Sequence, residues 1–287
     1  MEIRGNVGMI YKEYLPPAHL SSSIECFWSL IDSASGADQP VQRIVPDGRI
    51  ELVFHLGMPY EREHRPGLFE TQPQAFLVGQ TTSVTMLRTS QHAKIFGVRF
   101  QSAGALPFFG VPLMELTGKF VDLETLFGAK GRELDERVRV SGSAAAAKDI
   151  VQAFLSQRCR TDEQQGKLIA LTRHIGEKGG IIPVRQLAFQ SGKSERQLER
   201  DFQKHVGIGP KTFSRILRFK RVFEAMSAER NWAAVAVDCG YYDQPHLLRD
   251  FREFAGLTPS SLDLSHFEMG LHFLLSGRVS GFSKKNA

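Results

Sequence analysis

The chain has 287 residues, 42% of them apolar, and a formal charge of +5. This length favours two domains, and this apolar fraction is too high for a disordered protein. No apolar run approaches the ~18 residues of a membrane span, and the N-terminus lacks the basic and apolar segments of a signal peptide. The composition therefore predicts a globular, cytoplasmic protein with no membrane partner.

Charge and cysteine content narrow the class of protein. Residues 1–150 contain 15 basic and 17 acidic side chains, whereas residues 151–287 contain 21 and 14. The basic C-terminal half permits contact with a polyanion, although solvated surface charge is the more usual explanation. Cys26, Cys159 and Cys239 are far apart and odd in number, which predicts neither a disulfide framework nor a zinc site.

Residues 1–100 are predicted to form mainly strands. Short apolar or alternating runs, punctuated by Gly and Pro, occur at 24–31, 49–56, 75–89 and 94–100. In VPDG, residues 45–48, the residues follow the order of a tight turn, with a strand expected on each side. Several short strands with turns predict a β-barrel or a sandwich.

Helical spacing of apolar residues replaces alternation from residue 101 to residue 156. Thr117 and Asp122 are candidate helix starts, because their side chains can cap a helix. The polar segment 156–166 is the expected linker. Residues 1–155 are therefore predicted to form a domain for effector binding or dimerisation, rich in strands and flanked by helices.

Residues 167–265 are predicted to form an all-helical domain of about seven helices. Pro183 and Pro210 stand where helices begin, and Ser194 with Gln197 gives a capping-box pattern. The tail, residues 266–287, is expected to pack weakly or fray. The predicted fold class is α+β with two domains.

An internal repeat links residues 186–210 to residues 234–259. Up to a glycine the offset is 48 residues, and beyond it the offset is 49, so the single insertion falls in a turn, where it costs least. The matched pairs are Leu187 with Val235, Ala188 with Ala236, Gly192 with Gly240, Leu198 with Leu247, Arg200 with Arg249, Asp201 with Asp250, Phe202 with Phe251, Gly207 with Gly256, and Pro210 with Pro259.

Each part of the repeat has a physical task. The small residue lets a second helix approach closely, and the first glycine can take a positive φ and end the first helix. Leu198 and Phe202 form the inward stripe of the second helix, as do Leu247, Phe251 and Phe254 in the second copy. Each copy is therefore predicted to be a helix-turn-helix.

The outward residues of each second helix are those that DNA would contact. Arg can donate two hydrogen bonds to guanine, Gln pairs with adenine, Glu accepts from cytosine, and Leu can touch a thymine methyl group. One such helix is more often merely solvated, but two copies in one basic domain favour double-stranded DNA. The base-facing candidates are Arg196, Glu199, Arg200, Gln244, Pro245, His246, Leu248 and Arg249, and the phosphate-binding candidates are Lys193, Lys211, Arg215 and Lys220.

A predicted helix from about Thr212 to Glu229 separates the two copies. Eighteen residues span roughly 27 Å, close to the ~34 Å between successive major-groove faces. One molecule could then read an asymmetric site with both recognition helices.

These segments resemble the AraC/XylS family of bacterial transcription regulators. The sequence 239–262 is similar to the family's signature segment, and 191–222 looks like its first helix-turn-helix and linker helix. By position in the motif, the resemblance implies base contacts at Arg196, Glu199 and Arg200, and at Gln244, Pro245, Leu248 and Arg249. Two departures stand out, because Pro245 lacks a donor and Asp201 replaces a residue that is commonly basic.

The N-terminal part looks like the sensory domain of one AraC-family subgroup, on the residues RIVPDGRIELVF and GVRF. The resemblance implies a small-molecule effector, RNA polymerase as a partner, and dimers made through helices beside a β-barrel. Arg43, Asp47, Arg49 and Arg99 are candidates for an anionic ligand, although a turn centred on Asp47 and a strand salt bridge are preferred.

Metal binding, catalysis and binding of a protein partner are the alternatives to a regulator controlled by a small molecule. His55 and His64 with nearby glutamates lack metal-ligand spacing, and no cofactor or catalytic motif is recognised. Some proteins join this DNA-binding unit to a cysteine alkyl acceptor used in repair, but that domain needs four cysteines at a zinc site. A protein partner for the N-terminal domain stays open as an alternative to a metabolite. The chain is therefore predicted not to be an enzyme.

Overall fold

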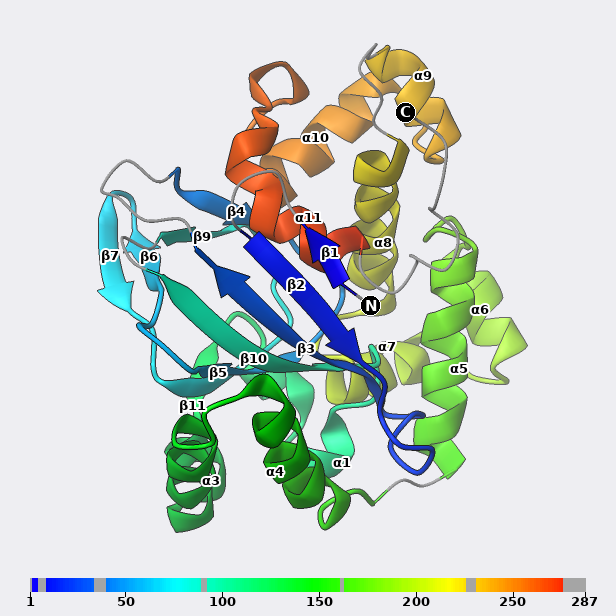
Figure 1. The fold of residues 1–287 in the computed structure, drawn as a ribbon. Helices are drawn as coiled ribbons and strands as arrows, with labels where there is room; N and C mark the ends of the chain where they lie inside the picture. The colour runs from blue at the N-terminus through cyan, green and yellow to red at the C-terminus, as the bar shows by residue number, and fades with distance from the viewer. Residues whose placement is uncertain are drawn as a thin grey trace.

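The computed structural model describes residues 2–4, 9–33, 40–88, 92–160, 163–225 and 231–275. Two antiparallel β-sheets form the N-terminal domain, with a group of helices along one side, and the C-terminal domain is helical (Figure 1). The α+β class with two domains is confirmed, and the strands form a sandwich rather than a barrel.

The larger sheet has seven strands in the order β1-β2-β3-β10-β5-β8-β11, and the smaller has four in the order β4-β9-β6-β7. The strands are β1 (Glu2–Arg4), β2 (Met9–Tyr14), β3 (Ile24–Asp32), β4 (Gln42–Ile44), β5 (Glu51–His55), β6 (Glu61–Arg65), β7 (Leu68–Thr71), β8 (Ala75–Val78), β9 (Thr85–Arg88), β10 (Ala93–Phe100) and β11 (Phe120–Asp122).

The central strands of the larger sheet are buried on both faces. In β3, Phe27 packs with the helices beside the sheet, whereas Cys26, Trp28 and Leu30 point to the opposite face, toward the smaller sheet. Strands covered on both faces have near-continuous apolar sequences, which explains the run from residue 24 to residue 31.

Local geometry tests three predicted features. The side chain of Asp47 accepts a hydrogen bond from the backbone N–H of Arg49 at 2.9 Å, which makes the predicted turn, and this turn carries the chain from one sheet to the other. Asp122 caps a helix, with its Oδ1 2.8 Å from the N–H of Thr125. Thr117 does not start a helix, and its hydroxyl instead reaches the C-terminal domain.

Helices beside the larger sheet complete the N-terminal domain, and those of the C-terminal domain follow. They are α1 (Leu106–Phe109), η1 (Leu113–Leu116), α2 (Leu123–Phe127), α3 (Ala129–Arg139), α4 (Ala144–Ser156), α5 (Glu163–Glu177), α6 (Val184–Gln190), α7 (Glu195–His205), α8 (Pro210–Ala225), α9 (Trp232–Asp238), α10 (Gln244–Ala255), η2 (Pro259–Ser261), η3 (Leu264–Phe267) and α11 (Glu268–Leu275), where η marks a 3-10 helix.

The predicted spacer helix is α8, which begins at Pro210 and is roughly 24 Å long over its 16 residues. Residues 226–230, in which its predicted end falls, lie outside the described part of the chain. The expectation that the tail packs weakly is wrong for residues 266–275. Phe267, Met269 and Leu274 are buried there, and α11 lies between β4 and α8 (Figure 1).

Candidate nucleic-acid interface

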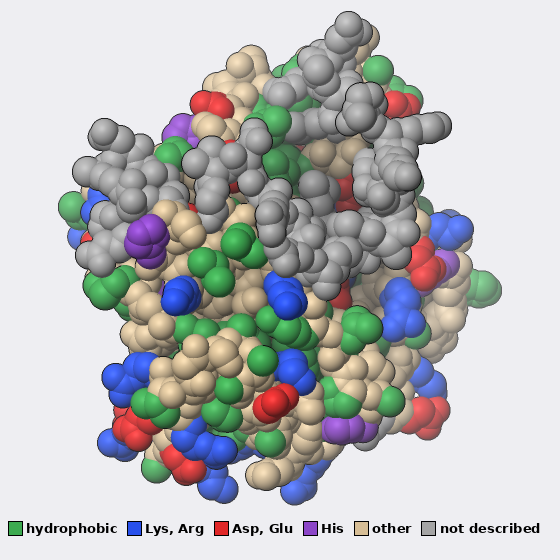
Figure 2. Space-filling view, viewed as in Figure 1, with side chains coloured by type: hydrophobic (Ala, Val, Ile, Leu, Met, Phe, Trp, Pro, Cys, Tyr) green, Lys and Arg blue, Asp and Glu red, His purple; other side chains and the backbone are tan. Residues whose placement is uncertain are grey.

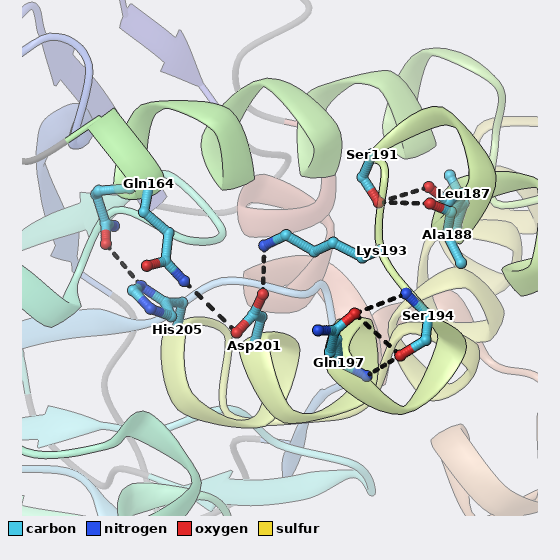
Figure 3. Close-up of polar contacts among 10 residues, drawn as sticks. Gln164, Leu187, Ala188, Ser191, Lys193, Ser194, Gln197, Asp201 and His205 are labelled. Carbon is cyan, nitrogen blue, oxygen red and sulfur yellow. Dashed lines mark hydrogen bonds and ion pairs between the residues drawn. The ribbon is translucent and has the colours of Figure 1, made fainter.

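The first helix-turn-helix consists of α6 and α7. Gly192 has a φ of 65° and makes the turn between them, as its lack of a side chain allows. Ser194 caps α7 through a capping box, because its Oγ accepts from the N–H of Gln197 and the Gln197 side chain accepts from the N–H of Ser194 (Figure 3). The predicted start of this helix is confirmed.

The second helix-turn-helix consists of α9 and α10. Gly240 has a φ of 79°, matching Gly192 of the first motif. Asp243 caps α10, with its Oδ1 2.8 Å from the N–H of His246. The helix ends at Gly256, which has a φ of 67°, just as Gly207 after α7 has a positive φ. The repeat in the sequence is thus a repeat in backbone geometry.

The inward stripes of both recognition helices are buried. Leu198 and Phe202 of α7 and Leu247, Phe251 and Phe254 of α10 are each 0% exposed. Their aromatic rings meet those of α8, as in the edge-to-face contact between Phe251 and Phe219 with centroids 5.0 Å apart. Both recognition helices are therefore packed on the same central helix.

The outward faces carry most of the predicted base-facing residues. Arg196 and Arg200 of α7, and Gln244, Pro245 and Arg249 of α10, are exposed. Three others are half-buried: Glu199 accepts a 3.2 Å hydrogen bond from Gln203, His246 lies edge-on against Tyr241, and Leu248 is partly covered. Both helices therefore present exposed hydrogen-bond donors to solvent.

A groove of about 620 Å³ lies between the segment 180–184 that precedes α6 and the outer face of α10. Lys211 and Arg249 line it, together with Arg215 and Arg218 of α8 and the acidic Asp250 and Glu253 of α10. On the face drawn in Figure 2, Lys and Arg side chains are dispersed among apolar and acidic ones. The groove brings basic side chains of α8 beside Arg249 of the second motif.

Two of the predicted phosphate-binding residues are held by internal ion pairs. Lys193 pairs with Asp201, whose carboxylate also lies 3.5 Å from Gln164 Nε2 (Figure 3). The acidic residue that departs from the family pattern therefore fixes the turn of its own motif. Arg215 binds Asp250 and Glu253 at 2.7 and 2.5 Å, which ties α8 to α10.

Lys220 lies away from the recognition helices, and its location does not support the predicted phosphate contact. It lines a polar cavity of about 350 Å³ between the two domains, together with Glu25 and Arg49 of the N-terminal domain. Burial, aided by the positive charges of Arg49 and Arg99, lowers the pKa of Lys220 to about 8.

Of the four predicted ligand-binding residues, Asp47 and Arg49 line a cavity between the two sheets, whereas Arg43 and Arg99 are not among its lining residues. Arg43 donates a 3.2 Å hydrogen bond to the carbonyl oxygen of Ala255 at the end of α10. Arg49 pairs with Glu25, and buried Arg99 pairs with Glu51 at 2.8 Å. Asp47 has the turn role described above. These residues serve an interdomain contact, two ion pairs and a turn.

The thiols and the acidic clusters offer little to an enzyme. Burial raises the pKa of Cys26, Cys159 and Cys239, so none is an activated thiolate. Among the described residues no group of three or more His, Cys, Asp or Glu side chains is arranged to hold a metal ion. The described helices include none with the length and apolar character to cross a bilayer.

Comparisons with known proteins divide the chain in two. Residues 12–122 match a family described as a domain of unknown function (DUF6597), and residues 187–263 match one described as a helix-turn-helix domain. The HTH-type transcriptional regulator GbdR of Pseudomonas aeruginosa is 33% identical over 79 residues, 27% of this chain. The match spans 22% of the length of GbdR.

Solved structures are similar at a lower level. ToxT of Vibrio cholerae has a TM-score of 0.44 at 11% identity, covering 88% of this chain and 99% of that one. The AraC-like transcriptional activator CuxR has a TM-score of 0.25 at 13% identity, covering 76% and 81%.

The match of residues 187–263 and the double helix-turn-helix define the C-terminal domain as a DNA-binding domain of the kind found in transcriptional regulators. Residues 187–263 form a helix-turn-helix domain of the AraC type, and residues 12–122 belong to the family of unknown function.

Proposed function

We propose that one molecule reads an asymmetric DNA site, with α7 and α10 in successive major-groove faces, under the control of a small molecule bound by the N-terminal domain. The observation that supports this proposal is the pair of capped helices. Both bury a Leu and a Phe four residues apart toward α8, and both expose polar side chains outward, Arg on α7 and Gln and Arg on α10. Arg196 and Arg200 would read one half of the site, and Gln244 and Arg249 the other.

The groove between the motifs supports this arrangement. When two helices enter successive major-groove faces, the phosphates of the DNA backbone between these faces lie against the protein. Lys211 is exposed beside Arg249, so both can approach these phosphates. Half of the site would thus be read on each side of a phosphate-binding strip.

The test is selection of a site from random DNA, followed by a change in its spacing. Five inserted base pairs turn one half-site to the opposite face of the duplex, so affinity is expected to fall at least about tenfold. Insertion of ten base pairs returns both half-sites to the same face of the duplex but increases the distance between them. Because α8 is rigid, binding to this DNA is expected to be weak as well. Full affinity after either insertion would show that the two helices act separately.

The alternative is an N-terminal domain that binds a protein partner instead of a metabolite. The small-molecule reading is favoured because a cavity lies between the two sheets. Stabilisation of the purified chain by a small molecule, measured as a shift in Tm, separates the two readings.

A further inference from the structure

The segment after the second helix-turn-helix returns to the N-terminal domain and docks on β4. Gln42 of this strand donates to the carbonyl of Ser265 and accepts from the N–H of Met269, each at 3.1 Å. Gly270 lies so close to the carbonyl oxygen of Arg43 that a side-chain carbon would stand 2.6 Å from it. Helix α11 is therefore fitted to this strand.

Helix α11 forms one wall of a cavity in the N-terminal domain. The cavity encloses about 90 Å³ between the two sheets, and Met269 and Phe273 of α11 line it together with Trp28, His55 and Phe76. Phe273 lies against Trp28, with ring centroids 5.0 Å apart. The segment that follows the DNA-binding domain thus supplies part of the wall of a cavity in the N-terminal domain.

Two buried polar atoms in the cavity lining have no hydrogen-bond partner among the described residues. They are Nδ1 of His55 and Nε1 of Trp28, in side chains that are each 1% exposed. The other ring nitrogen of His55 lies 3.2 Å from Gln72 Oε1. Buried polar groups of this kind are normally paired, so two unpartnered ones in residues that line a cavity favour a polar ligand.

The charges around the cavity are already balanced. The guanidinium groups of Arg49 and Arg99 pair with Glu25 and Glu51, and burial lowers the pKa of His55 to about 4, which keeps its ring neutral. The carboxylate of Asp47 also lines the cavity. An anion would lose its hydration here without meeting a free positive charge.

The cavity is too small for a ring-sized ligand unless part of its wall moves. A cavity of about 150 Å³ accepts benzene, so a ring-sized ligand needs more room than this one has. His55 and Phe76 lie on strands fixed by hydrogen bonds to both neighbours, whereas α11 is a short helix outside both sheets. Met269 and Phe273 are the lining residues that can retreat.

We infer that this cavity takes a small uncharged molecule with one ring and a hydroxyl or carbonyl group, and that its binding displaces α11 from β4. The polar group pairs with His55 and Trp28, and the ring replaces Phe273. The displacement pulls on the chain beside Arg43, whose guanidinium holds the end of α10. This inference rests on the proposed small-molecule control and identifies its site and its mechanical link.

The test uses benzyl alcohol as the uncharged probe and benzoate as its anionic match. In a Trp232→Phe variant of the full chain, Trp28 is the one remaining tryptophan and reports the cavity. Benzyl alcohol is expected to change Trp28 emission and raise Tm, and benzoate at equal concentration to do neither. Equal binding of benzoate would overturn the uncharged class.

Variants and hydrogen exchange test the role of α11. Met269→Ala and Phe273→Ala each enlarge the cavity and are expected to tighten benzyl alcohol binding about fivefold or more, whereas exposed Phe189→Ala leaves it unchanged. Saturating probe is expected to speed exchange in residues 268–275 about threefold or more. Unchanged exchange there overturns the displacement, and no probe binding by any variant overturns the site. DNA binding measured on the same samples tests the proposed function separately.

Discussion

Thr117 and Gly207, 90 residues apart in the chain, are joined by a 2.7 Å hydrogen bond from the Thr117 hydroxyl to the Gly207 carbonyl oxygen. Arg43 makes a similar link to Ala255, the residue before Gly256. Gly207 and Gly256 are equivalent positions of the repeat. The N-terminal domain therefore holds both recognition helices at the same end, one through η1 and the other through β4.

Removing these two links should loosen the domains independently. Thr117→Val and Arg43→Leu are each expected to lower the free energy of unfolding by about 1 kcal/mol, the typical value of one hydrogen bond. Because the links are on different strands and helices, the losses should add in the double variant. Urea unfolding measures them, with exposed Thr71→Val as the control. A loss from only one variant would show that a single link couples the domains.

Arg249→Ala tests direct reading of DNA by α10. Arg249 is exposed on the outward face, so its loss should weaken binding to the selected site by about 1–3 kcal/mol and binding to random DNA far less. Titration of both DNAs by fluorescence anisotropy gives the two affinities. Arg252→Ala, an exposed arginine in the last turn of the same helix, is the matched control. Equal losses on both DNAs would mean that Arg249 contacts only phosphate.

The sequence predicts phosphate binding for both Arg215 and Lys211, but the structure leads us to expect different effects of their substitution on stability and on DNA binding. Arg215→Ala leaves the buried carboxylate of Asp250 with its weaker partner Arg218, 3.8 Å away, and should destabilise the fold by about 1–3 kcal/mol. Lys211→Ala should leave stability unchanged and make the salt dependence of DNA binding shallower by about one phosphate contact. Chemical unfolding and salt titration measure the two effects. If the Arg215→Ala variant keeps the full stability of the wild type, the ion pairs of Arg215 do not stabilise the fold, and a phosphate contact is again the better explanation of this residue.

Much of this architecture is local and could be predicted. The caps at Ser194 and Asp122 need only residues within one turn of each helix, and Gly192 and Gly240 mark turns because other residues avoid a positive φ. The burial of Leu198 follows from the spacing of apolar residues alone. The DNA-reading half is therefore the half that the sequence describes best.

Features that depend on distant partners were missed. Strands β6 and β7 were not predicted, because their charged residues carry no apolar alternation. In the fold Glu61 pairs with Arg88 and Arg62 with Glu70 on neighbouring strands. The contacts of Arg43 and the docking of Met269 join residues more than 200 positions apart, where neither segment alone carries a pattern.

Lys220 gives the last prediction, a dependence of stability on pH. Its pKa is about 8 in the folded chain and 10.5 when unfolded, because burial and the charges of Arg49 and Arg99 oppose protonation, while Asp47 and Glu25 favour it. Between these values the unfolded state binds more protons, so this residue makes stability rise as pH increases from 8 to 10.5 and adds no pH dependence below 8. The difference in unfolding free energy between the wild type and Lys220→Met should therefore shift in favour of the wild type from pH 8 to pH 10. Urea unfolding at each pH measures this difference, in which the other titrating groups cancel. A curve for Lys220→Met that runs parallel to the wild type would show that Lys220 titrates normally and is not held between the domains.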